Sequence, residues 1–181
     1  MNEFFLNDYY RATGREWKAI KFLRLLEKPG LRYLYFLRKE QCAKYSLESW
    51  VFRRNRMRIQ LKFGLEINSL QIQKGCVIEH PYNIAINKHV KIGVNFCVTK
   101  GVTIGKDFRG KRKGTPIIGN YVFVGANATL VGNIVIGNDV LIAPNSYVNI
   151  DIPDHSIVLG APCKIIPCEK ATEGFINNLK P

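Results

Sequence analysis

The sequence predicts a mainly β protein, built as a solenoid of short parallel strands behind a basic helical segment. Three observations support this prediction. Aliphatic residues recur at every sixth position through most of the chain after residue 64, and small residues follow many of them. The period breaks twice, and each break adds two residues. The first 62 residues instead hold 15 Lys or Arg against 6 Asp or Glu, with apolar residues at helical spacing.

The six-residue period is the main signal for the fold. Neither a helix of 3.6 residues per turn nor a strand with a period of two keeps this spacing. In a solenoid, each hexad forms one short flat side with its aliphatic residue pointing inward, and a small residue lets the chain turn the corner. Three sides close a coil of about 18 residues, and coils stack about 4.8 Å apart. The expected inward positions are Ile72, Ile78, Ile86, Ile92, Val98, Ile104, Ile118, Val124, Leu130, Ile136, Ile142 and Val148.

The two breaks in the period are expected to form loops. The first falls within VIEHPYN (77–83) and contains His80. The second lies between Ile104 and Ile118 and contains GKDFRGKRKGTP, the most basic short stretch of the C-terminal half. Loops on a rigid scaffold frequently carry function, so both breaks are candidates for a site.

The N-terminal segment, residues 1–63, is predicted to be helical. Apolar residues at helical spacing indicate one helix from Trp17 to Leu26 and a second after Pro29. A third, intensely basic stretch covers 49–63. These helices are expected to cap the open end of the solenoid, because an uncovered end would expose unpaired strand edges. Their charge also suits contact with an acidic membrane surface.

Composition narrows the class of protein. No apolar run approaches the roughly 18 residues of a membrane span, and the polar start MNEFFLNDYYRATGRE lacks the pattern of a signal peptide. The five cysteines form no CxxC pair, which indicates reduced thiols in a cytoplasmic protein and no disulfide frame or zinc site. The net charge of +13 favours an anionic partner or marks a solvated helical face. Nucleic acid is not expected, because the coils lack interleaved aromatic and basic residues.

Residues 64–168 resemble the hexapeptide-repeat acyltransferases, and most closely their serine acetyltransferase-like branch, which includes enzymes that O-acetylate sugars of bacterial surface polysaccharides. The resemblance rests on IEHPYN around His80, KGVTIG (100–105), GKRKGTPIIGN (110–120), VGANATLVGNIVIGNDVLIAPNS (124–146) and GAPCKII (160–166). It implies a left-handed parallel β-helix over 64–168 and a C-terminal tail over 169–181. It also implies a homotrimer with acetyl-CoA as co-substrate between neighbouring β-helices, and no metal.

The resemblance gives His80 the role of general base, which takes the proton from an acceptor hydroxyl that attacks the thioester directly. Histidine suits this role because its reference pKa of about 6.5 leaves it largely neutral near pH 7. The alternatives are an ordinary loop residue and a metal ligand. A metal site of the β-helix carbonic anhydrase type needs three histidines, and His89 and His155 have no matching context. Either Glu79 or Glu66 could orient His80, although Glu66 fits the family position only with a one-residue shift and could simply face solvent.

The same resemblance implies a coenzyme site. Lys164 in the GAPCKII stretch would meet a phosphate of the coenzyme, and the basic loop would supply further partners. Backbone N–H groups near the corner glycines would stabilise negative charge on the thioester oxygen. The residues expected at this site are Gly105, Arg109, Lys111, Arg112, Gly125, Ala126, Ala143 and Lys164.

The acceptor is the least constrained part of the prediction. Serine acetyltransferases carry an Arg-His pair that holds the serine carboxylate, just before a proline that corresponds to Pro116. Here Gly114 and Thr115 occupy the two positions. Because carboxylate binding by arginine depends on geometry, we expect a surface-polysaccharide sugar as the acceptor, at the inner face of the membrane. Serine is the alternative acceptor, and a non-catalytic trimeric scaffold is the alternative of a different class.

Overall fold

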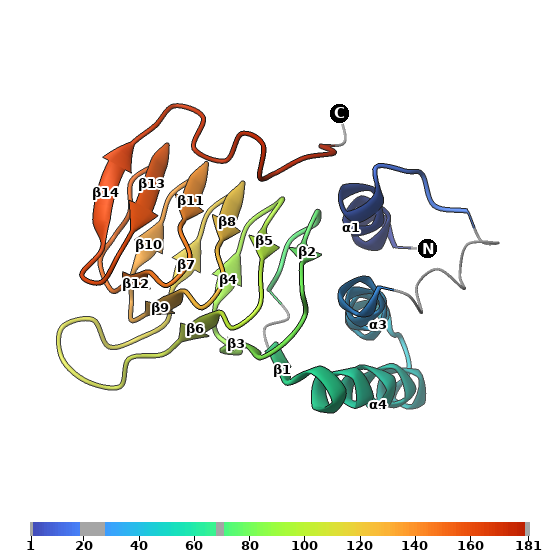
Figure 1. Cartoon of the computed structure of the whole chain (residues 1–181). Coiled ribbons are helices and arrows are strands. Elements are labelled where there is room, and N and C mark those ends of the chain that lie inside the picture. The colour runs from blue at the N-terminus through green and yellow to red at the C-terminus, as the bar shows by residue number, and fades with distance from the viewer. Residues whose placement is uncertain (1, 19–27, 68–70, 180–181) are drawn as a thin grey trace.

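The computed structural model describes residues 2–18, 28–67 and 71–179 (Figure 1). Within these ranges the chain begins with helices α1 (Glu3–Thr13), α3 (Pro29–Cys42) and α4 (Ser46–Phe63). The strands that follow are β1 (Leu65–Ile67), β2 (Val77–Ile78), β3 (Ile84–Ile86), β4 (Lys91–Ile92), β5 (Cys97–Val98), β6 (Thr103–Gly105), β7 (Ile117–Ile118), β8 (Val122–Val124), β9 (Thr129–Val131), β10 (Val135–Ile136), β11 (Val140–Ile142), β12 (Tyr147–Val148), β13 (Ser156–Leu159) and β14 (Lys164–Pro167).

The strands form three parallel sheets that the chain visits in turn, so the predicted solenoid is confirmed (Figure 1). We call them face A (β1-β3-β6-β9-β12), face B (β4-β7-β10) and face C (β2-β5-β8-β11-β13). Equivalent hexad positions pair directly, as Ile104 of β6 does with Leu130 of β9. All twelve predicted inward residues are buried, with at most 8% of their surface exposed. Strand β14 adds to face C in the antiparallel direction and ends the parallel stacking there.

The corners use small residues differently from the prediction. The residue that turns the chain has a left-handed backbone and lies just before most of the strands, as at Asn127 (φ 59°) and Asn145 (φ 59°). Asparagine tolerates this conformation better than most residues. The glycines that follow the inward positions instead permit close stacking. A Cβ at Gly119 would lie 2.5 Å from the carbonyl oxygen of Gly137 in the next coil.

The N-terminal helices cap the solenoid, as predicted. Apolar side chains of α3 and α4 belong to the same buried cluster as the first coil. These side chains are Tyr33, Leu34, Leu37, Ile59 and Phe63. Figure 1 shows the helices at the end of the solenoid next to β1 and β2, with α1 above α3 and α4 below it. The open end of the β-helix core is therefore covered by apolar helix faces, which removes its exposure to water.

The first predicted helix is wrong at its start. Trp17 lies outside any helix, because α1 already ends at Gly14 in a left-handed cap (φ 65°). The indole instead packs edge-on against Phe5 and Tyr9 of α1, with ring centroids 5.4 and 5.0 Å apart. The remainder of that predicted helix, 19–26, lies outside the described residues. Helix α1 itself was not predicted; the side chain of Asn2 caps it by accepting from the Phe4 N–H at 2.8 Å.

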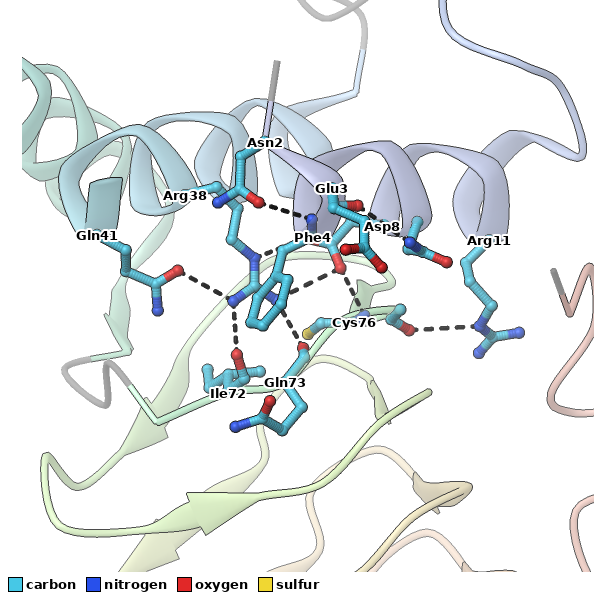
Figure 2. A network of polar contacts seen from close by, with 12 residues as sticks. Asn2, Glu3, Phe4, Asp8, Arg11, Arg38, Gln41, Ile72, Gln73 and Cys76 are labelled. Carbon is cyan, nitrogen blue, oxygen red and sulfur yellow. Dashed lines mark hydrogen bonds and ion pairs between the residues drawn. The ribbon is translucent and has the colours of Figure 1, made fainter. Parts of the chain in front are cut away.

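A buried polar network joins α1, α3 and the first coil (Figure 2). Arg38 donates from Nε to Asp8 Oδ2 at 2.8 Å, and the side chains are 1% and 0% exposed. Arg38 also donates to the backbone oxygens of Ile72 and Gln73, at 2.5 and 2.7 Å. Asp8 Oδ1 accepts from the Cys76 N–H at 2.8 Å. The network therefore fixes α1 against the strand that leads to His80.

The C-terminal tail returns along face C to the helical end of the molecule (Figure 1). Ala171 and Ile176 join a second buried cluster with the outward side chains of face C. Asp139 holds the tail by accepting from the Ala171 and Thr172 N–H groups and from the Thr172 hydroxyl. The tail ends beside α1, where Asn178 Nδ2 donates to the Arg11 oxygen at 3.1 Å.

Candidate active site

The first break in the period forms the corner between β2 and β3, where His80 is exposed. Other corners between faces C and A have one left-handed residue, three positions after the inward aliphatic, as at Gly101. In this corner the equivalent residue is Asn83, which comes five positions after Ile78 because of the two extra residues. His80 is a second left-handed residue, with φ 47°. A left-handed backbone is uncommon for histidine and requires support from its surroundings. The two extra residues therefore give this corner a second left-handed position, which His80 occupies.

His80 lines a pocket of about 560 Å³, a size typical of small-molecule sites. Three parts of the chain form its walls: the end of β2 with its corner, the facing ends of α1 and α3, and the C-terminal tail. The lining residues are Arg11, Ala12, Lys28, Pro29, Gly30, Leu31, Leu34, Val77, Ile78, Glu79, His80, Pro81, Cys97, Phe175, Asn177 and Asn178. Segments from both ends of the sequence thus close around the corner that carries His80.

The close approach of α3 to β2 shapes this pocket. A Cβ at Gly30 would meet the carbonyl oxygen of Ile78 well inside van der Waals contact. Only glycine allows the first turn of α3 to lie this near the strand. Pro29 begins the helix, where its missing N–H costs nothing. The N-terminal end of α3, with its partial positive charge, therefore borders the pocket.

The pocket contains charged groups of both signs. Arg11 and Lys28 come from the helical side, and Glu79 comes from the β2 corner beside His80. The thiol of Cys97 also lines the pocket, and burial raises its pKa to about 12, so it is not a nucleophile near neutral pH. The arrangement offers a base, a carboxylate and two cations to one small molecule.

Glu66 does not share this pocket. It lies on the outward side of β1 and is exposed, whereas its neighbours Leu65 and Ile67 are buried. With Lys88 and Gly105 it lines a separate hollow of about 350 Å³ on face A. Strand alternation is the reason, because a one-residue shift from Leu65 turns the side chain to the outer face of the sheet. Of the two predicted carboxylates, the structure places only Glu79 beside His80.

The other two histidines occupy exposed corners, as expected. His89 is exposed and follows β3, and the side chain of Thr115 donates to its backbone oxygen at 3.4 Å. His155 pairs with Asp139 at 3.0 Å, and this hydrogen bond raises the His155 pKa. In 2–18, 28–67 and 71–179, no cluster of three His, Cys, Asp or Glu side chains is arranged to hold a metal ion.

The second break forms an extruded loop closed by two hydrogen bonds between Asp107 and Gly114. Arg109 and Lys111 are exposed at its tip. Arg112 points back to the solenoid and donates to Asp151 Oδ2 at 3.1 Å. Of the three phosphate partners predicted in this loop, Arg109 and Lys111 are therefore unpaired among the described side chains, and Arg112 already has a carboxylate partner.

The remaining residues predicted for the coenzyme lie at two edges of face A. Gly105 lies at the end of β6, beside the basic loop. Gly125, Ala126 and Ala143 lie at the corners between faces C and A, and a Cβ at Gly125 would be 2.6 Å from the Pro144 nitrogen. Lys164 is exposed at the start of β14. Within one chain these residues do not converge on one pocket, so a site that uses them all needs a neighbouring chain.

Sequence reasoning missed most of the pocket. Arg11, Lys28 and the tail residues Phe175, Asn177 and Asn178 were not singled out. Neither spacing nor composition indicates that residues more than 160 positions apart meet. Gly14 is a signal in the sequence for the end of a helix, but it does not indicate that this end packs against the C-terminal tail.

Comparisons with known proteins identify the class. Residues 115–149 match the family model "Bacterial transferase hexapeptide (six repeats)". The Helicobacter pylori (strain J99) serine acetyltransferase is 32% identical over 156 residues, which cover 86% of this chain and 88% of that protein. Serine acetyltransferase 4 of Arabidopsis thaliana is 35% identical over 127 residues, 68% of this chain but 33% of the relative. The chain thus spans about a third of the plant relative's length.

Solved structures agree with the sequence comparisons. The soybean serine acetyltransferase apoenzyme superposes with a TM-score of 0.72 and 26% identity, covering 90% of this chain and 67% of that one. The Neisseria gonorrhoeae serine acetyltransferase in complex with serine gives a TM-score of 0.68 and 25% identity, covering 90% and 66%. The chain belongs to the serine acetyltransferase family of left-handed β-helix acyltransferases. This membership favours an enzyme over the non-catalytic scaffold.

Proposed function

We propose that the chain transfers an acetyl group from acetyl-CoA to the hydroxyl of serine. The observation that supports this best is the pocket that His80 and Glu79 line together with Arg11 and Lys28. A base, a carboxylate and cations suit the hydroxyl, the ammonium and the carboxylate of an amino acid. The assignment also rests on the relatives, which are serine acetyltransferases, and on the serine-bound Neisseria structure.

In the proposed reaction His80 accepts the proton of the acceptor hydroxyl as the oxygen attacks the carbonyl carbon of the thioester. A C–O bond forms, and the carbonyl oxygen takes up the negative charge. When the carbonyl re-forms, the C–S bond breaks and the coenzyme leaves as a thiolate, which receives the proton from the imidazolium. His80 gains one proton from the hydroxyl and gives one proton to the thiolate, so it ends the cycle neutral. General base catalysis of this kind contributes about 10² to 10⁴ in rate.

The surface-polysaccharide sugar expected from the sequence is the second candidate acceptor. The relatives favour serine over it. One observation supports the sugar: Gly114 and Thr115 replace the Arg-His pair, and neither can bind a carboxylate through a guanidinium. A serine acceptor therefore requires that another cation take over this role.

We propose a homotrimer in which the coenzyme lies between neighbouring β-helices. The scatter of Gly105, Gly125, Ala143 and Lys164 over two edges of face A supports this, because a neighbouring chain is needed to bring such residues together. Closed threefold symmetry gives three equivalent sites. Static light scattering at micromolar concentration should give three times the chain mass, and a monomeric mass would contradict the proposal.

Peripheral contact with an acidic membrane is a proposal from charge, and a cytoplasmic location is a proposal from the unpaired cysteines. Helix α4 exposes Trp50, Met57 and Leu61 beside Arg54 and Arg58. In the part of the chain that the structure describes, no helix combines the length and apolarity needed to cross a bilayer. Co-sedimentation with phosphatidylglycerol vesicles, against phosphatidylcholine vesicles as control, tests this contact.

The proposed function is tested by measuring thiol release from acetyl-CoA with a panel of hydroxyl acceptors. The panel contains L-serine and surface-glycan sugars, with L-alanine as the control that lacks the hydroxyl. We expect release with serine, and O-acetylserine as the product by mass spectrometry. If thiol is released only with a sugar, the acceptor is a sugar and the acetyl-transfer reaction stands. If no member of the panel causes thiol release, both the acceptor and the reaction are contradicted.

A further inference from the structure

Three arginines of the described chain are buried: Arg11, Arg38 and Arg56, with 5%, 0% and 6% of their surface exposed. Two of them have a carboxylate partner. Arg38 pairs with Asp8 at 2.8 Å, and Arg56 pairs with Glu40 at 2.7 Å. Arg11 is the exception, since no carboxylate of the described residues lies within ion-pair distance of its guanidinium.

The hydrogen bonds of Arg11 leave its charge uncompensated. Nε donates to the Gly75 oxygen at 3.3 Å, and Nη1 donates to the Asn177 oxygen. Both acceptors are neutral backbone carbonyls, and Nη2 has no partner among the described residues. Buried charges are normally paired, because an unpaired one loses its hydration without return. Burial lowers the Arg11 pKa, and the more distant charges of Glu79 and Asp8 only partly offset this effect.

Arg11 lines the same pocket as His80 and Glu79 and comes from the helical side, although its Nε also donates to the Gly75 oxygen just before β2. Lys28, whose Nζ donates to the Ala12 oxygen at 3.1 Å, and the N-terminal end of α3 add positive potential on that side. Among the residues that line the pocket, Glu79 is the only acidic one. The pocket therefore combines cations from the helices with one carboxylate, which is next to the candidate base in the sequence.

We propose that Arg11 binds the carboxylate of the amino-acid acceptor, in place of the pair that Gly114 and Thr115 replace. This inference rests on the proposed function and names the residue that selects an α-amino acid. The carboxylate supplies the missing counter-ion of the guanidinium. Glu79 then faces the ammonium group, and the side-chain hydroxyl is directed toward His80. Arg11 is thus a specificity residue contributed by α1.

The competing explanation is that Arg11 only joins the first coil to the tail through Gly75 and Asn177. The two roles predict different results for an acceptor without the carboxylate. We compare kcat/KM for L-serine and L-serinamide in the wild type and in Arg11→Gln. Differences in amine ionisation between the two acceptors cancel when the variant is compared with the wild type.

If Arg11 binds the carboxylate, the wild type prefers serine to serinamide. In Arg11→Gln the ratio of kcat/KM for serine to kcat/KM for serinamide should then fall by about tenfold or more, as expected for loss of a charge-assisted contact. Arg11→Lys keeps the charge without the planar fork, so its ratio should lie between them. Arg15→Gln removes an exposed charge near the same end of α1 and should leave the ratio unchanged. Thr172→Val loosens the tail without removing charge, lies outside the residues that line the pocket, and should also leave the ratio unchanged.

An equal loss for serine and serinamide in Arg11→Gln would overturn the inference and leave serine as the acceptor. Equal use of both acceptors by the wild type would do the same. If the wild type does not acetylate serine at all, the proposed function is overturned. The assignment of Arg11 to an amino-acid carboxylate is then overturned as well, because it rests on that function. If Arg11→Gln does not fold, Arg11→Lys decides the matter, since a wild-type ratio there contradicts the need for the guanidinium geometry.

Discussion

Replacing Asp8 by Asn tests whether the network in Figure 2 holds α1 in place. The change keeps the shape of the side chain but removes the negative charge that faces Arg38 at 2.8 Å. Both groups are at most 1% exposed, so the guanidinium cannot recover hydration. Removing one partner of a buried ion pair costs about 3 to 5 kcal/mol. The amide keeps only one acceptor oxygen, so its NH2 group faces either the Arg38 Nε–H or the Cys76 N–H, a donor against a donor.

The assay is urea denaturation at a fixed chain concentration, because assembly makes the stability concentration-dependent. The matched control is Glu3→Gln in the same helix, whose pair with Lys74 has side chains 68% and 44% exposed. An exposed pair of this kind contributes less than about 1 kcal/mol. The double variant Asp8→Asn with Arg38→Met should recover part of the loss, since the unpaired charge is gone. A loss below about 1 kcal/mol in Asp8→Asn would refute the reasoning.

Three further predictions concern the pocket wall, the coenzyme and the tail. Gly30→Ala should lower the melting temperature and acceptor affinity together, because the new methyl group meets the Ile78 oxygen; an unchanged KM for serine contradicts this. Lys164→Ala should raise the KM for acetyl-CoA more than it lowers kcat, and an unchanged KM removes Lys164 from the site. Partial burial acts to raise the Asp139 pKa, but hydrogen bonds from Thr172 and His155 outweigh it and lower the pKa, so its contribution to tail docking is lost only as pH falls through that lowered value. The raised His155 pKa means that the contribution of His155 is complete below about pH 6.5 and is lost as pH rises through the raised value. Hydrogen-exchange protection of the Ala171 N–H should therefore fall at low pH and at high pH, and it should be abolished in Asp139→Asn. Protection that does not change with pH would count against the assignment.

The solenoid was predictable because each hexad repeats one simple constraint. An inward aliphatic residue such as Ile104 or Val124 must be buried in every coil, so the period survives in the sequence. The loops were predictable for the same reason, since two extra residues cannot be accommodated on a flat side. The corner chemistry was only half predicted: the glycines do serve the close stacking of coils, but the turn itself falls on Asn127 and its equivalents.

The pocket was not predictable because it depends on contacts between distant segments. His80 and Glu79 could be named from their place in a break, whereas Arg11 reaches them only after α1 is fixed by Asp8 and Arg38. Glu66 illustrates the opposite case. A position one residue from the expected one looks minor in sequence, yet in a strand it moves the side chain to the other side of the sheet.

The central claim is tested most directly by the turnover of His80→Ala with acetyl-CoA and serine, measured beside His89→Ala. His80 lies at an exposed corner and not on the inward aliphatic row, so the variant should keep its assembly, its melting temperature and its affinity for acetyl-CoA. Its kcat should fall by about 10² to 10⁴, the contribution expected from a general base. His89→Ala removes an equally exposed histidine outside the pocket and should retain wild-type turnover. Wild-type turnover in His80→Ala would contradict the account, because the proton transfer is assigned to His80 and not to the neighbouring Glu79 carboxylate.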